Sequence, residues 1–80
     1  MPIIRLQYFA ILRDQRGEAS ETLETKSGTA GELYAELKSN YNFPLSVDRL
    51  RVAVNGEFSE MDTTLQDQDE VVFIPPVAGG

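Results

Sequence analysis

A single strong helix signal between two groups of strand patterns is the feature that most restricts the fold of this chain. Thr29 is a suitable N-cap, and Glu32 completes a capping-box pattern, in which the two side chains satisfy free backbone amides at the helix start. Apolar residues then recur at helical spacing: Ala30, Leu33, Tyr34, Leu37 and Tyr41. The sequence therefore predicts a helix over residues 30–41 that packs one apolar stripe against a sheet.

Two strand patterns precede this helix. Residues 3–9 alternate between apolar and polar, and Phe9 is an apolar exception on the polar face. The apolar face comprises Ile4, Leu6 and Tyr8. A short helical turn over 10–17 and a weaker strand around 19–25 follow, so these two strands are expected to form a hairpin.

Further strand patterns follow the helix. Alternation over 50–54 leads into an Asn-Gly turn and a return strand around 57–60, which predicts a second hairpin. Residues 62–65 are expected to form one helical turn before a final strand over 70–75. The first and last strands should pair in parallel because the helix lies between them. The fold class is therefore α+β: a roll of about five mixed strands around one main helix.

Composition limits the chemistry available to the chain. The sequence has no Cys and no His, which excludes a thiol nucleophile, an imidazole base and a soft metal site. We therefore expect no catalysis by this chain alone and assign no metal. A net charge of -6 opposes binding to nucleic acid or to anionic membranes. Without a secretory signal or a long apolar span, a soluble cytoplasmic protein is expected.

The C-terminal end is the feature that points most directly to function. It consists of Pro75, Pro76, Val77, Ala78, Gly79 and Gly80. Two glycines leave the backbone carboxylate without neighbouring side chains, and the prolines stiffen the exit from the last strand. Six extended residues reach roughly 20 Å. We therefore divide the chain into a domain over 1–74 and a tail over 75–80 that can enter the active site of another protein.

The chain resembles a known family in its fold pattern and in its ending. The order of strands and helix resembles the β-grasp roll of ubiquitin-like proteins, and residues 69–80 are similar to the ending of molybdopterin synthase small subunits. Residues 8–10 and 50–56 also match patterns of that family. One departure is Gln68, where the family often has Gly between two acidic residues, so the turn type there is open.

This resemblance implies a sulfur carrier that is not an enzyme on its own. An adenylating enzyme would use ATP to convert the Gly80 carboxylate into an acyl-adenylate, and sulfur would replace AMP to give a thiocarboxylate. That sulfur would pass to a pterin precursor in a site formed largely by the large subunit of the synthase. The implied assembly has two small and two large subunits, with no permanently bound cofactor. The tail would be positioned by Pro75, Pro76, Val77, Ala78 and Gly79.

A partner surface is predicted beside the tail. Strand parity places Phe9 and Ile74 on the face opposite Leu6 and Phe73, and pairing of the first and last strands brings them together. Phe58, just after the Asn-Gly turn, extends this patch. The simpler interpretation is scattered exposed apolar residues, which are common on soluble proteins.

Three alternative functions share part of this pattern. A sulfur carrier of the thiamine pathway would have the same fold and the same loaded terminus, although the Pro-Pro-Val run argues against it. A ubiquitin-like modifier would join Gly80 to a lysine of a target protein. A β-grasp interaction module would bind through its sheet and would keep its function without Gly80.

Overall fold

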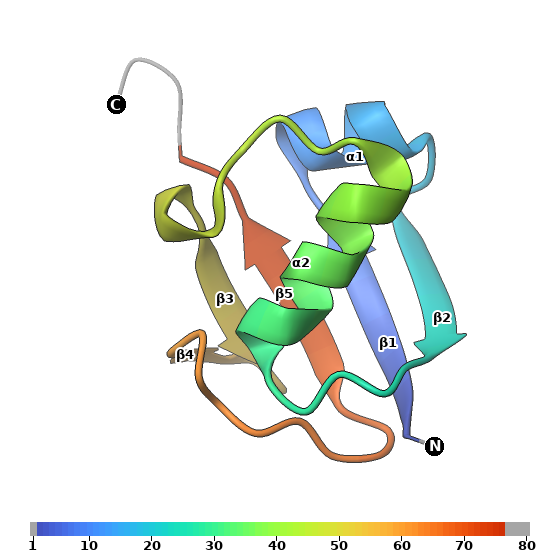
Figure 1. The fold of residues 1–80 in the computed structure, drawn as a ribbon, viewed down its shortest axis with the longest axis vertical. Coiled ribbons are helices and arrows are strands. Elements are labelled where there is room, and N and C mark those ends of the chain that lie inside the picture. Colours follow the sequence, from blue (N-terminus) through green and yellow to red (C-terminus); the bar gives the residue numbers. More distant parts are fainter. Residues whose placement is uncertain (1, 77–80) are drawn as a thin grey trace.

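The computed structural model describes residues 2–76 and shows a five-stranded sheet with a long helix across one face (Figure 1). The helices and strands are β1 (Ile3–Tyr8), α1 (Ala10–Arg16), β2 (Ser20–Glu24), α2 (Ala30–Tyr41), the 3-10 helix η1 (Val47–Arg49), β3 (Arg51–Val54), β4 (Glu57–Ser59) and β5 (Glu70–Ile74). Within the described residues, no helix is long and apolar enough to cross a membrane.

The sheet has the strand order β2-β1-β5-β3-β4. Its central pair, β1 and β5, is parallel, with Leu6 beside Val71 and Tyr8 beside Phe73, and the other three pairs are antiparallel. This arrangement confirms the predicted roll of five mixed strands around one main helix. The long connection through α2 allows the parallel pairing, because a tight hairpin would force the strands to run in opposite directions.

The main helix begins and ends where its sequence signals place it. The Thr29 side chain accepts a hydrogen bond from the Glu32 amide at 3.2 Å, and the Glu32 side chain accepts one from the Thr29 amide at 3.1 Å. The helix ends before Asn42, which adopts a left-handed conformation with φ 56°. Its buried residues are Ala30, Leu33, Tyr34 and Leu37. The capping box and the apolar stripe of the prediction are thus both present.

Phe43 extends the core beyond the end of α2, a role not assigned to it from the sequence. Its ring lies 5.8 Å from Tyr8, 6.0 Å from Tyr34 and 5.7 Å from Tyr41, measured between ring centroids. The Tyr34 hydroxyl donates to the Leu45 carbonyl at 2.7 Å. These contacts fold the segment after α2 back onto the sheet, and η1 follows directly. The sequence pattern did not predict η1.

The predicted helical turn over 62–65 is wrong. Thr64 instead forms an isolated β-bridge with Thr29, and the Ala30 amide donates to the Thr63 carbonyl at 3.1 Å. The segment therefore bonds to the start of α2, whose first amides have no partner within the helix. Local turn signals cannot reveal such a distant partner.

Gln68 resolves the turn type that the sequence left open. It adopts a left-handed conformation with φ 72°, and its amide donates to the Ile3 carbonyl at 2.7 Å. The chain therefore has the positive φ that favours glycine at this position, although the residue is not glycine. The turn places the start of β5 beside the start of β1.

Candidate docking surface at the root of the tail

An apolar hollow of about 710 Å³ surrounds the point where the chain leaves β5. We call it the tail-root hollow. It is lined by Phe9, Ala10, Ile11, Leu45, Arg49, Ile74, Pro75 and Pro76. Pro75 is buried and Pro76 is exposed. The last described residues of the chain therefore form part of this surface.

The pairing of β1 with β5 explains how two distant residues meet in the hollow. Tyr8 lies beside Phe73, and both side chains are buried under α2. The next residues, Phe9 and Ile74, therefore project away from that core at the same end of the sheet. Phe9 is 45% exposed, and Ile74 is half-buried. The structure thus brings these two predicted interface residues together, while their role in binding stays a prediction.

Phe58, the third predicted interface residue, lies elsewhere. It is on the edge strand β4, opposite Ala53, which in turn lies opposite Val72 of β5. We call Phe58, Ala53 and Val72 the outer-face row. Phe58 is 75% exposed and does not line the tail-root hollow. The predicted single patch is therefore two surfaces, the outer-face row and the tail-root hollow. They are neighbours because Val72 of the row and Ile74 of the hollow lie on the same face of β5.

Ala10 has the least usual backbone conformation in the hollow. Its φ of 51° is left-handed, which costs an alanine about 1–2 kcal/mol. The turn at Ala10 leaves Phe9 and Ile11 exposed on one side and buries Leu12 on the other. Nothing in the sequence suggested this, because Asn or Gly is the usual residue for such a position. Strained residues of this kind often occur at binding sites.

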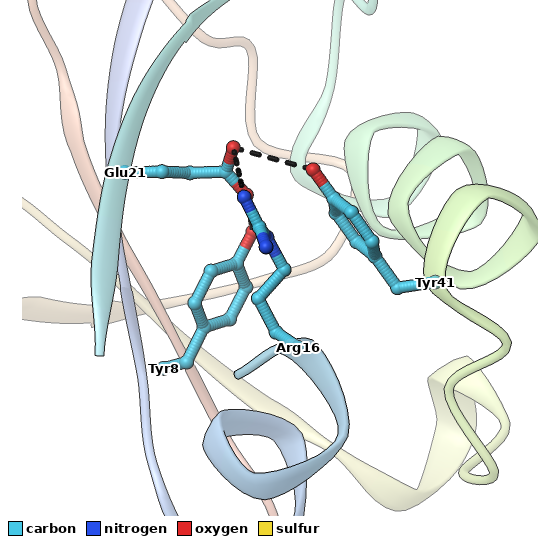
Figure 2. A network of polar contacts seen from close by, with 4 residues as sticks. All are labelled: Tyr8, Arg16, Glu21 and Tyr41. Atoms are coloured by element: carbon cyan, nitrogen blue, oxygen red, sulfur yellow. Dashed lines mark hydrogen bonds and ion pairs between the residues drawn. The ribbon is translucent and has the colours of Figure 1, made fainter. Parts of the chain in front are cut away.

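A network of polar side chains joins four elements of the fold (Figure 2). Glu21 of β2 accepts hydrogen bonds from the Tyr8 hydroxyl at 2.5 Å, from Arg16 Nε at 3.1 Å and from the Tyr41 hydroxyl at 3.3 Å. The Arg16 guanidinium also lies 4.4 Å from the centre of the Tyr41 ring, within cation-π range. One carboxylate therefore joins β1, β2, α1 and α2.

The charges of this network depend on one another. Burial and the hydrogen bond to Glu21 raise the pKa of Tyr8 far above its ordinary value, so its hydroxyl remains a donor. Burial also opposes ionisation of Glu21, but hydrogen bonds from Arg16 and Tyr8 outweigh that effect and lower its pKa. Glu21 is therefore ionised at neutral pH. These groups act as a structural support, which the sequence pattern did not reveal because the partners come from four separate elements.

The predicted carrier position and most of the predicted tail lie outside the residues that the structure describes. These are Val77, Ala78, Gly79 and Gly80. Among residues 2–76, no group of three or more potential ligand side chains is arranged to hold a metal ion. The described part of the chain thus offers an apolar surface beside the tail.

Comparison with known proteins connects this surface to a family. The family described as ThiS matches residues 6–80. The molybdopterin synthase sulfur carrier subunit of Mycobacterium tuberculosis is 36% identical over 80 residues, covering 96% of both chains. The similarity thus extends over nearly the whole chain, including the ending.

Solved structures share the fold. A Pyrococcus furiosus protein provisionally named molybdopterin converting factor subunit 1 superposes with a TM-score of 0.81 and 30% identity, covering 96% of this chain and 100% of that chain. A second similar chain comes from the Helicobacter pylori complex of subunits 1 and 2 of molybdopterin-converting factor. It has a TM-score of 0.66 and 22% identity, covering 98% of this chain and 99% of that chain. At this identity, the second likeness concerns the fold alone.

Proposed function

The chain belongs to the ThiS family, and from this premise we propose that it is the sulfur-carrier small subunit of a molybdopterin synthase. The observation that carries the proposal is the 36% identity to a molybdopterin synthase sulfur carrier subunit over 96% of both chains. The Gly-Gly terminus agrees with it, since a sulfur carrier without cysteine must use its backbone carboxylate.

The proposed cycle has three steps at Gly80. Its carboxylate attacks the α-phosphorus of ATP in an adenylating enzyme, and pyrophosphate leaves to give the acyl-adenylate. A sulfur donor then attacks the activated carbonyl carbon, and AMP leaves with one former carboxylate oxygen. The resulting thiocarboxylate gives its sulfur to a pterin precursor, after which oxygen from water restores the carboxylate. Each dithiolene needs two sulfurs, so the carrier must be loaded repeatedly.

The chain itself would supply docking and reach, while its partners supply the catalytic groups. The tail-root hollow offers an apolar contact for the large subunit, and Gly79 allows close approach to a channel wall. We expect two small and two large subunits in the assembly, and no cofactor held by the small one. A cytoplasmic location belongs to the same proposal, because loading consumes ATP.

Intact mass spectrometry tests the loading step. The chain is incubated with the adenylating enzyme of the same organism, ATP and a sulfide source. We expect one oxygen to be replaced by one sulfur, and no change in a matched chain that lacks only Gly80. An unloaded chain would refute the carrier function and leave the interaction module and the modifier as the alternatives.

A second assay separates the remaining alternatives. The loaded chain is mixed with the large subunit and the pterin precursor, and we expect dithiolene formation with loss of the thiocarboxylate. Loading without transfer to the pterin would point to the thiamine pathway. A covalent adduct with a lysine of another protein, in place of loading, would point to a modifier.

A further inference from the structure

Negative charge is concentrated at one end of the molecule. The segment between β3 and β5 and the first residue of β5 carry Glu57, Glu60, Asp62, Asp67, Asp69 and Glu70. No Lys or Arg follows Arg51 in the sequence. The negative charges of these six acidic residues equal in number the net charge of -6. The loop between β4 and β5 lies at the end of the sheet where β5 begins, opposite the end from which the chain continues to Pro75 and Pro76 (Figure 1). The molecule therefore has an acidic end that faces away from the tail.

Two arginines lie at the other end, beside the root of the tail. Arg49 and Arg51 are both exposed and line a second hollow together with Ile74, Pro75 and Pro76. Arg49 also lines the tail-root hollow, so the two surfaces are continuous. We call Arg49 and Arg51 the arginine pair.

Neither guanidinium of the arginine pair makes a hydrogen bond or ion pair within residues 2–76. Arg5, Arg16 and Lys38 each donate to an acceptor in the described structure. Arg13 and Lys26 have no hydrogen-bond or ion-pair partner there, but they line neither hollow. Asp48 is the one acidic residue in the lining of the second hollow, so the lining keeps a net positive charge. Two exposed guanidinium groups without a partner among residues 2–76 thus lie beside Pro75 and Pro76.

We propose that the arginine pair binds carboxylates at the mouth of the large subunit's tail-receiving channel and orients this chain with its tail foremost. The inference rests on the proposed function. Guanidinium groups match carboxylates in charge and geometry. An acidic channel mouth would attract the arginine pair and repel the acidic end, so the same field favours one orientation during approach.

The reach of the tail identifies the anion as part of the partner. The four residues after Pro76 span at most about 14 Å when extended. If a channel holds the tail extended, a group bound at Gly80 lies far beyond the hydrogen-bonding distance of about 3 Å from a side chain at the root. The phosphates of a nucleotide or a pterin at Gly80 are therefore unsuitable partners for the arginine pair. Carboxylates on the channel rim would instead lie beside the root of the tail, where the arginine pair can reach them.

Association kinetics with the large subunit of the same organism test this inference. Arg49→Gln with Arg51→Gln should slow association about tenfold at low salt, as expected when steering charges are removed. Near 1 M salt, where the Debye length is about 3 Å, the rates of variant and wild type should converge. The double lysine variant, Arg49→Lys with Arg51→Lys, should keep most of the wild-type rate because it keeps both charges.

Lys26→Gln is the matched control for one lost positive charge. Lys26 is exposed and belongs to the segment between β2 and α2, which lies at the end of the sheet where β5 begins (Figure 1). Each single arginine-to-glutamine variant should slow association more than Lys26→Gln does. Equal effects would overturn the inference, because only net charge would then matter. A loss that persists near 1 M salt would also overturn it, because apolar packing would then be the cause.

The outcome for the wild type separates this inference from the proposed function. If the wild-type chain loads sulfur and binds the large subunit, but the arginine variants associate as fast as it does, only the steering role is refuted. If the wild-type chain does not bind the large subunit at all, the proposed function fails and the inference fails with it.

Discussion

The two faces of β5 carry similar apolar residues but differ in what covers them. Val71 and Phe73 on the inner face are fully buried beneath α2, whereas Val72 and Ile74 on the outer face are only half-buried. The same strand thus contributes to the core on one side and to an uncovered surface on the other. The hydrophobicity of these four side chains does not distinguish the buried face of β5 from the uncovered one. The position of α2 does.

The largest effect on stability is expected on the inner face. Phe73→Ala removes a fully buried ring that packs 5.2 Å from Tyr34, and should lower the free energy of unfolding by about 3–5 kcal/mol. Urea denaturation monitored by circular dichroism measures the change. A loss no greater than that of Ile74→Ala would mean that the two faces of β5 do not differ as described.

On the outer side, binding should be affected more than folding. Phe9→Ala and Ile74→Ala should each weaken binding to the large subunit by about 2 kcal/mol or more, as for residues that anchor an interface. Their free energies of unfolding should fall by only about 1 kcal/mol or less. Titration calorimetry and thermal melts of the same samples compare the two quantities. Unchanged affinity in both variants would remove these residues from the interface.

The polar network around Glu21 predicts that the stability of the fold depends on pH. Glu21 has a lowered pKa in the folded protein, so its contribution is present above the ordinary glutamate pKa of about 4.3 and is lost as the pH falls through the folded value. Glu21→Gln should cost about 1–2 kcal/mol at pH 7, where charged hydrogen bonds are lost.

Urea denaturation between pH 7 and pH 3 measures both effects. The stability gap between wild type and Glu21→Gln should narrow toward low pH, because protonated Glu21 resembles the neutral amide. A gap that stays constant over this range would show that the charge of Glu21 does not stabilise the fold.

The smallest effect is expected at Ala10 in the hollow. Ala10→Gly should raise the free energy of unfolding by up to about 1 kcal/mol, because glycine adopts a positive φ without strain. Ala10→Val should lower it, since a β-branched residue is strongly disfavoured there. Thermal melts compare the variants. A destabilising glycine and a neutral valine would contradict the assigned backbone strain.

Local signals and strand parity predicted the parts of the molecule that depend on neighbouring residues. The capping box at Thr29 needs only Glu32, and the meeting of Phe9 with Ile74 follows from alternation once β1 pairs with β5. The order of strands around one helix was enough to predict that pairing. These features require no knowledge of side-chain packing.

The features that the sequence did not reveal depend on distant partners. Phe43 is buried because Tyr8 of β1 and two tyrosines of α2 surround it. The Glu21 network likewise draws on four elements, and Ala10 adopts a conformation that its side chain does not favour. Phe58 was grouped with Phe9 as an apolar residue just after the Asn-Gly turn, but β5 and β3 lie between β4 and β1, the strand that Phe9 follows. Tertiary arrangement decides each of these cases.

The central position of β5 also has a mechanical consequence. This strand is hydrogen-bonded along both edges, to β1 on one side and to β3 on the other, and the tail continues from its end. A pull on the tail along the strand would load both ladders in shear, so many hydrogen bonds would resist it together. A tail on an edge strand would let a partner peel the bonds apart one at a time. The fold therefore attaches the tail to an interior strand, which should resist traction better than an edge strand would.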